Sequence, residues 1–123
     1  MFLNYTPHDI NILDKDNQVI EVIPSRGVIR VSQKREFVCL LRGIPLYEST
    51  YGEIEYPSGF SLNNQGIDWV DMEEESDIII VSRMVKEAIL KQENKSYSDR
   101  FVVPDDIVRD DKGNIIGCKG FSA

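Results

Sequence analysis

Alternation of apolar and polar residues is the feature that most limits what this chain can form, because side chains alternate between the two faces of a β-strand. The pattern predicts strands over residues 9–13 and 18–23, joined as a hairpin by the polar cluster Asp14–Asn17. A second turn is predicted at Pro24–Gly27, where proline fixes φ and glycine allows a positive φ. Further strands are predicted, in chain order, over residues 28–32, 36–41 and 44–47.

Helical periodicity predicts one main helix. Ile78–Val81 is typical of a buried strand, and Ser82 after it is a good N-cap for a helix ending near Gln92. The apolar residues of this segment fall on one helical face. They are Met84, Val85, Ala88 and Ile89.

The C-terminal residues predict one more hairpin. Phe101–Val103 forms a strand that Pro104 ends, Asp111–Asn114 forms a turn, and Ile115–Cys118 is the return strand. Several short strands in series predict an antiparallel β-rich meander or roll. The predicted fold class is therefore α+β with one main α-helix, in a single domain over residues 1–123.

Residues 51–76 have no clear period. They predict a long loop with at most a short strand over residues 53–56, and a loop of this length is usually functional or mobile. Trp69 lies within it, either as an aromatic that faces a partner or as an anchor packed on the core.

Composition excludes several classes of protein. Cys39 and Cys118 stand singly inside apolar runs, so we expect two reduced, buried thiols. Met1–Leu3 carries no basic residue, which predicts that there is no signal peptide. The apolar run Ile78–Val81 is far too short to cross a bilayer. We expect a soluble protein of the cytoplasm with no membrane partner.

Charge is segregated along the chain. The formal net charge is −7, which argues against binding to polymeric nucleic acid. Residues 26–42 nevertheless carry five basic residues against Glu36, whereas residues 43–82 carry nine acids and no Lys or Arg. Each block is either a solvated face or, for the arginines, a means of holding a small anion. Three arginines adjoin predicted strand or helix ends: Arg83, Arg100 and Arg109.

The residues that could perform catalysis form no recognisable set. His8 is the only histidine, and the cysteines lack zinc-ligand spacing, so no metal site is expected. We expect His8 to be a structural hydrogen-bonding residue rather than a base. Asp105-Asp106 and Asp110-Asp111 could bind a metal, but adjacent acids at turns are common. There is no glycine-rich phosphate loop.

An anion site is predicted where the buried strand meets the helix. A helix N-terminus offers free amides and partial positive charge, and Ser82 and Arg83 add a hydroxyl and a cation there. Arg109, oriented by Asp110, could add a bidentate contact to a phosphate. Phe101 or Tyr97 could stack on a base.

Short motifs in a fixed order carry a resemblance to a known family. They are Asn4–His8, Ile23–Gly27, Gly43–Pro45, Val81-Ser82 and Arg109–Gly113. This order resembles a family of small phage and prophage proteins that includes Thoeris anti-defence sponges, and the likeness spans nearly the whole chain.

The resemblance implies a protein of the host cell cytoplasm that binds glycocyclic ADP-ribose, the signal made by TIR-domain proteins, and withholds it uncleaved. It also implies homo-oligomers, as dimers or trimers of dimers, and a second site for cyclic oligonucleotides. This chain has Pro-Ser-Arg-Gly at residues 24–27, where many relatives look like Pro-Pro-Ser-Gly, so the resemblance does not identify which backbone groups near Arg26 would serve that second site.

Two other classes of function remain open. One is a magnesium-dependent hydrolase of ADP-ribose derivatives that uses the paired aspartates. The other is a structural or interaction module of a phage particle, in which the acidic residues of the 51–76 segment meet a partner protein. The sponge differs from the hydrolase in needing no catalytic residue, cofactor or metal, and from the interaction module in binding a nucleotide.

Overall fold

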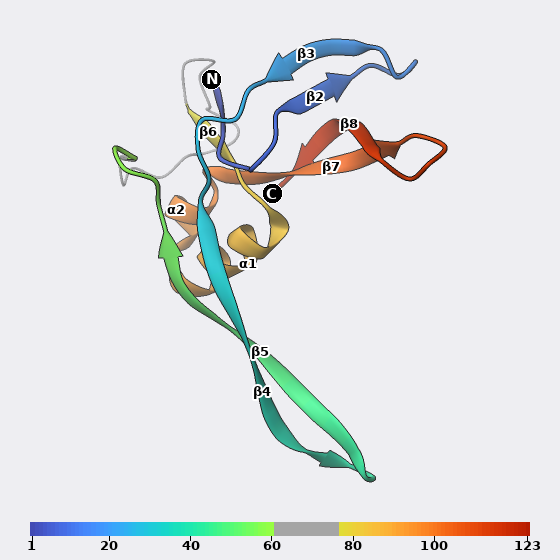
Figure 1. Ribbon diagram of the computed structural model, residues 1–123. Helices are drawn as coiled ribbons and strands as arrows, with labels where there is room; N and C mark the ends of the chain where they lie inside the picture. The colour runs from blue at the N-terminus through green and yellow to red at the C-terminus, as the bar shows by residue number, and fades with distance from the viewer. Residues whose placement is uncertain (61–76) are drawn as a thin grey trace.

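The computed structural model describes residues 1–60 and 77–123 of the chain (Figure 1). Trp69 and the run Glu73–Glu75 lie outside the described residues, so the interpretations placed on them are not addressed. The elements are β1 (Phe2–Asn4), β2 (Ile10–Leu13), β3 (Val19–Ile23), β4 (Arg30–Leu41), β5 (Ile44–Glu55), β6 (Ile78–Ile80), α1 (Arg83–Gln92), α2 (Lys95–Ser98), β7 (Phe101–Arg109) and β8 (Ile115–Ser122).

Six strands form a mixed sheet in the order β1-β6-β7-β8-β2-β3, and β4 and β5 pair separately. The β-rich α+β fold with one main helix is confirmed, as are the hairpins β2–β3 and β7–β8. The sheet differs from a purely antiparallel meander, because β1–β6, β6–β7 and β2–β8 are parallel pairs. A parallel central strand is buried on both faces, which is why β6 is a run of isoleucines.

The two edges of this sheet meet, so that it is nearly a closed barrel. Asn4 at the end of β1 bridges to Ser25 just after β3, and the Arg26 N–H donates to the Asn4 carbonyl at 2.8 Å. The Asn4 side chain is fully buried and donates to the carbonyls of Ile23, at 3.0 Å, and His8, at 2.8 Å. Its Oδ1 accepts from the Thr6 N–H and hydroxyl. The first two motifs of the chain thus close the sheet.

The core lies on both sides of β6 and β7. Ile79 and Val81 pack with Val85 and Ile89 of α1, whereas Ile80 packs on the other side of the sheet. Its partners there are Ile10, Ile23, Val102 and Cys118. The predicted helix and its Ser82 N-cap are confirmed, although Met84 is 39% exposed rather than part of the buried face. Cys118 is buried as expected, but Cys39 is only half-buried.

A buried lysine joins α1 to the chain that follows it. The Lys86 side chain donates to the carbonyls of Ser98, at 2.6 Å, and Phe101, at 2.8 Å. Ser98 ends the short helix α2, which the polar tract 93–99 did not predict. Lys86 therefore fixes the start of β7 against α1, with its charge satisfied by carbonyl oxygens.

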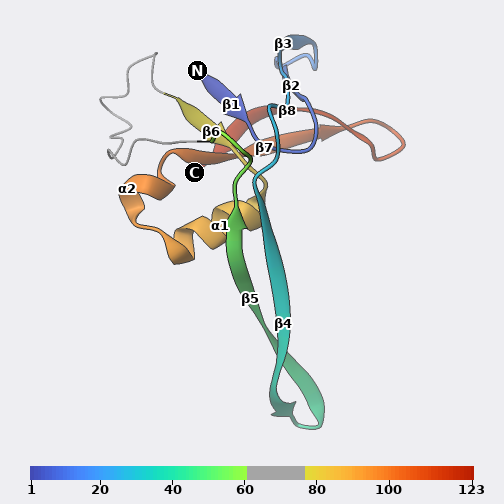
Figure 2. The ribbon, with the colours of Figure 1, turned by 60° about the vertical axis from the view of Figure 1, so that its left-hand side comes forward.

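The β4–β5 hairpin is the largest departure from expectation. Residues 28–32 and 36–41 were predicted as separate strands, but β4 is continuous from Arg30 to Leu41, and β5 runs on to Glu55. A loop beginning at residue 51 is therefore wrong for residues 51 and 52, and the short strand allowed over residues 53–56 is the end of β5, which stops at Glu55. The base of the hairpin packs on α1 through Val31 and Ile54, while its outer part projects from the body (Figures 1 and 2).

Strand β7 also runs further than predicted. It passes through Pro104 and continues to Arg109. Pairing with β6 ends at Val102, so Pro104 does not have to donate a hydrogen bond on that side. Among the described residues, no helix is long and apolar enough to span a membrane.

Candidate ligand-binding site

A cavity of about 390 Å³ opens at the start of α1. One wall is the turn after β1, with Tyr5 and Thr6, and the opposite wall is the N-cap residue Ser82 with Val85. The beginning of β4 supplies Arg30 and Ser32, and the end of β5 adds Glu55, so the polar lining holds one acid beside its arginine. Its volume lies within the range of small-molecule sites, ~300–1,000 Å³.

The local structure makes this end of α1 electropositive. Ser82 has extended backbone angles, and its hydroxyl accepts a 3.4 Å hydrogen bond from the Val85 N–H. The first turn of α1 holds no acidic residue. The helix dipole therefore places partial positive charge at the cavity, next to Arg30, while the carboxylate of Glu55 in the same lining offsets part of that charge.

The structure brings together some of the predicted residues and separates others. Ser82 lines the cavity as expected, but Arg83 is not among the residues that line it and is exposed. Arg30, Tyr5 and Thr6 were not predicted as site residues. Tyr5 and Thr6 belong to the Asn4–His8 motif, which was the available signal for them. The motif lies beside Ser82 only through the parallel pairing of β1 with β6, which the sequence did not reveal.

Arg109 and Asp110 lie at the tip of the β7–β8 hairpin, which projects away from α1 (Figures 1 and 2). The Asp110 carboxylate accepts from the backbone N–H groups of Asn114 and Lys112, both at 2.9 Å. The Asn114 hydrogen bond is the main cause that lowers the pKa of Asp110. Arg109 donates to the Gly113 carbonyl at 3.0 Å. Within one copy, both residues stabilise this turn and do not meet Ser82.

The expectation that Phe101 stacks on a base is corrected by its burial. Its ring has no exposed surface and packs in the core against Tyr97, so a ligand cannot reach it. Tyr97 is half-buried, and its hydroxyl is hydrogen-bonded to that of Tyr56 at 2.9 Å. Arg26 is exposed, and its backbone N–H closes the sheet.

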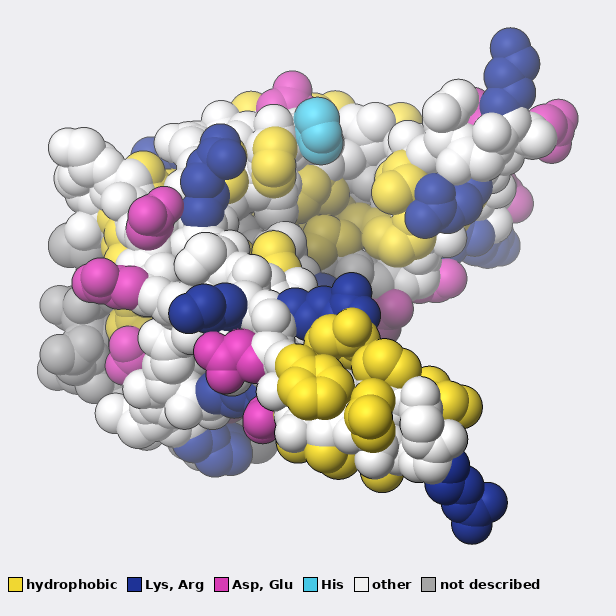
Figure 3. Space-filling view, turned by 60° about the horizontal axis from the view of Figure 1, so that its bottom comes forward, with side chains coloured by type: hydrophobic (Ala, Val, Ile, Leu, Met, Phe, Trp, Pro, Cys, Tyr) yellow, Lys and Arg dark blue, Asp and Glu magenta, His cyan; other side chains and the backbone are white. Residues whose placement is uncertain are grey.

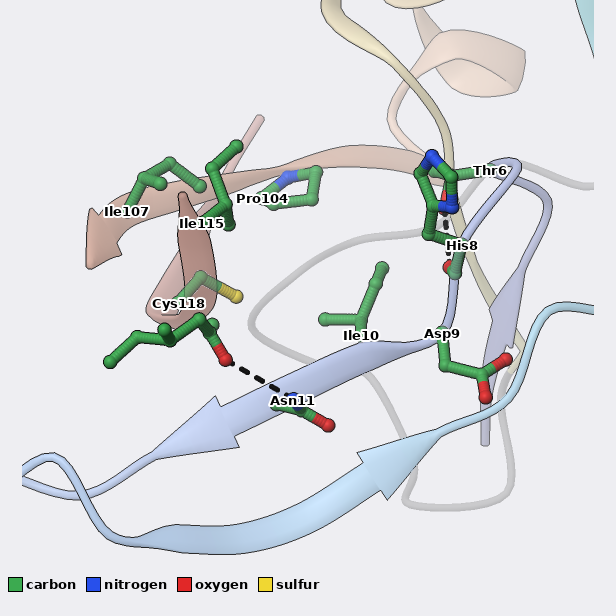
Figure 4. Close-up of a pocket in the computed structure, with 11 residues that line it drawn as sticks. Thr6, His8, Asp9, Ile10, Asn11, Pro104, Ile107, Ile115 and Cys118 are labelled. Atoms are coloured by element: carbon green, nitrogen blue, oxygen red, sulfur yellow. Dashed lines mark hydrogen bonds between the residues drawn. The ribbon is translucent and has the colours of Figure 1, made fainter. Parts of the chain in front are cut away.

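A second hollow, which we call the trough, lies between β2 and the β7–β8 hairpin (Figure 4). It has a volume of about 270 Å³ and is mostly apolar. Its lining comprises Ile10, Pro104, Ile107, Ile115, Ile116 and Cys118, with His8 and Asp9 at one end. Burial raises the pKa of the Cys118 thiol, which disfavours the thiolate and argues against a nucleophile.

The paired aspartates do not assemble into a metal centre. In residues 1–60 and 77–123, no group of three or more His, Cys, Asp or Glu side chains is placed to hold a metal ion. Asp105 instead accepts from the Asp106 N–H at 2.7 Å, next to a positive φ of 53° at Asp106. This pair shapes a turn in the strand.

Comparison with known proteins adds no relative: no family model, no curated protein and no solved structure matches this chain.

Proposed function

We propose that this protein binds glycocyclic ADP-ribose, the signal made by TIR-domain proteins, and sequesters it without cleaving it. The proposal rests on the family resemblance of the ordered motifs and on one structural observation. The cavity at the start of α1 combines a helix N-terminus, an arginine, hydroxyl groups and an aromatic ring, with one acid, Glu55, in the same lining. A pyrophosphate joined to riboses and a base presents complementary groups.

Each part of such a ligand has a candidate partner. The amides at the start of α1 and Arg30 suit the pyrophosphate, because both favour negative charge. The hydroxyls of Ser32 and Ser82 can bind ribose or phosphate oxygens, and the Tyr5 ring can contact the base. Sequestration would block Thoeris immunity in the host cytoplasm, and it requires tight, pre-organised contacts rather than reacting groups.

Calorimetric titration of paired arginine variants tests this placement. We expect Arg30→Ala to weaken binding of glycocyclic ADP-ribose at least ~10-fold, since a charge-assisted contact is worth roughly 1.5–3 kcal/mol. Arg83→Ala removes an arginine that is near in sequence to Ser82 but does not line the cavity, so it is the matched control. Wild-type affinity in the Arg30 variant, with loss in the Arg83 variant, would contradict the placement.

The hydrolase alternative makes a different prediction about metal and product. Paired aspartates acting with magnesium would lose activity in a chelator and release ligand of changed mass. Under the sponge proposal, the chelator leaves affinity unchanged, and heat denaturation returns the ligand intact. A cleaved product that requires magnesium would favour the hydrolase.

A further inference from the structure

The two ends of the β4–β5 hairpin carry different kinds of side chain. Large apolar side chains gather over its outer end (Figure 3). At its base, where β4 begins and β5 ends, Arg30 and Glu55 are paired across the two strands. Among the described residues, these two are the only charged ones that line the cavity at the start of α1. The base of the hairpin therefore supplies the charged side chains of the candidate ligand site.

Packing of the hairpin base explains how these two side chains reach the cavity. The next pair along the strands, Val31 with Ile54, is buried in the core with residues of α1. Because side chains alternate between the two faces of a strand, Arg30 and Glu55 project from the opposite face. Both are exposed there and line the cavity, so a ligand in it can contact them.

Arg30 and Glu55 do not neutralise each other. Opposite charges at directly paired positions of two strands are close enough to interact. Within residues 1–60 and 77–123, however, no ion pair or side-chain hydrogen bond engages either residue. The cavity thus presents a cation and a separate carboxylate, each with its hydrogen-bonding groups available to a ligand.

The carboxylate of Glu55 is unsuited to the pyrophosphate of the proposed ligand, because like charges repel. An ionised carboxylate accepts hydrogen bonds and donates none, so it selects groups that donate. A ribose with a free vicinal diol offers two adjacent donors, and an acidic side chain binds ribose hydroxyls in this way in dinucleotide-binding folds. Glycocyclic ADP-ribose is cyclised between its two riboses, and one of them keeps both hydroxyls of its diol.

We propose that Glu55 accepts hydrogen bonds from this ribose diol and is a specificity-determining residue of the cavity, while Arg30 holds the pyrophosphate. The inference rests on the proposed function and deepens it, because it assigns different parts of the ligand to the two charged side chains. It also gives the cavity a means of rejecting competing nucleotides. A phosphate on the ribose, as in NADP, replaces a hydroxyl donor and brings a further negative charge to Glu55.

Calorimetric titration of Glu55→Gln distinguishes hydrogen bonding from repulsion, because the two predict changes of opposite sign. If Glu55 only repels the pyrophosphate, removing its charge tightens binding of glycocyclic ADP-ribose. If Glu55 accepts from the diol, the neutral amide weakens binding by roughly fivefold or more, since hydrogen bonds to charged groups are the stronger ones. Glu53→Gln is the matched control and should change affinity less than ~2-fold. It removes the same charge from an exposed residue of the same strand that does not line the cavity.

A ligand without the diol tests the same contact in the unaltered protein. Periodate cleaves vicinal diols, and borohydride reduction of the product gives a probe that keeps the adenine and the pyrophosphate. We expect the wild-type chain to bind this probe at least ~5-fold more weakly than the intact ligand. Glu55→Ala, which has no acceptor, should bind the probe and the intact ligand within about twofold of each other. An undiminished affinity of the wild-type chain, or equal losses in both proteins, would overturn the proposal.

The outcomes also separate this inference from the proposed function. An unchanged circular dichroism spectrum establishes that each variant is folded. Glycocyclic ADP-ribose that binds the wild-type chain, and binds Glu55→Gln equally or more tightly, would overturn the role of Glu55 and leave the proposed function standing. Failure of the wild-type chain to bind glycocyclic ADP-ribose would overturn both.

Discussion

Replacing the buried Asn4 should remove a large part of the stability of the fold. Asn4→Ala leaves the buried Ile23 carbonyl without its donor, a penalty of ~1–3 kcal/mol. Three further part-buried hydrogen bonds, to His8 and to the N–H and hydroxyl of Thr6, add ~0.5–1 kcal/mol each. The expected loss is about 3–5 kcal/mol, against a total of ~5–15 kcal/mol for a domain of this kind.

Urea unfolding followed by circular dichroism measures this loss. With a slope of roughly 2 kcal/mol per molar urea, the midpoint should fall by about 2 M. Asn11→Ala is the matched control, because Asn11 makes a single side-chain hydrogen bond, to the Ile116 carbonyl, near the surface. Its midpoint should fall by less than ~0.5 M. Equal effects of the two substitutions would refute the conclusion that Asn4 closes the sheet.

Three further substitutions probe other features. Lys86→Met should destabilise the fold by about 2–4 kcal/mol in urea, because two carbonyls lose their donor; a neutral effect would show that they find other partners. Arg109→Ala should cost under ~1 kcal/mol and leave ligand affinity within about twofold, since its contact lies in an exposed turn; a tenfold loss would move the ligand to that hairpin. Burial raises the pKa values of Tyr56 and Tyr97 above 10.0, so the folded state keeps protons that the unfolded state loses, and stability should fall as pH rises above 10. A Tyr56→Phe/Tyr97→Phe variant should show a shallower alkaline loss, and an identical slope would refute this origin.

Local signals predicted the parts of the fold that depend on nearby residues. Ser82 followed by apolar residues at helical spacing defines α1, because capping and amphipathic packing act within a few turns. The Asp110–Asn114 turn likewise contains its own hydrogen bonds and a glycine at φ 83°. Elements of this kind need no knowledge of distant contacts.

Features that depend on distant contacts were missed. The parallel pairing of β1 with β6 joins residues more than seventy positions apart in the sequence and leaves no local pattern. The β4–β5 hairpin was predicted as three short strands followed by a loop because polar residues interrupt its apolar runs, although pairing with β5 keeps β4 continuous. Phe101 was predicted to stack on a base of the ligand. Its position at the start of a strand does not reveal that its ring packs in the core with residues of α1.

In the candidate site, too, residues with a local sequence signal were predicted and residues placed by distant contacts were missed. Ser82 was predicted from its own sequence context, and Arg30 was missed because β4 reaches the start of α1 only through tertiary packing. Arg109 and Ser82 were combined as one anion site, but within one copy they belong to different ends of the molecule. Sequence therefore identifies chemically suitable residues more readily than it identifies which of them share a cavity.

The central proposal is tested most directly by titrating the purified wild-type chain with glycocyclic ADP-ribose in a calorimeter, then denaturing the complex by heat and weighing the released ligand by mass spectrometry. Sequestration predicts saturable, metal-independent binding with micromolar or tighter affinity, and a released ligand of unchanged mass. Absence of binding at ligand concentrations on the order of 100 μM, where a micromolar site would be ~99% occupied, would contradict the proposal. So would a released product of altered mass.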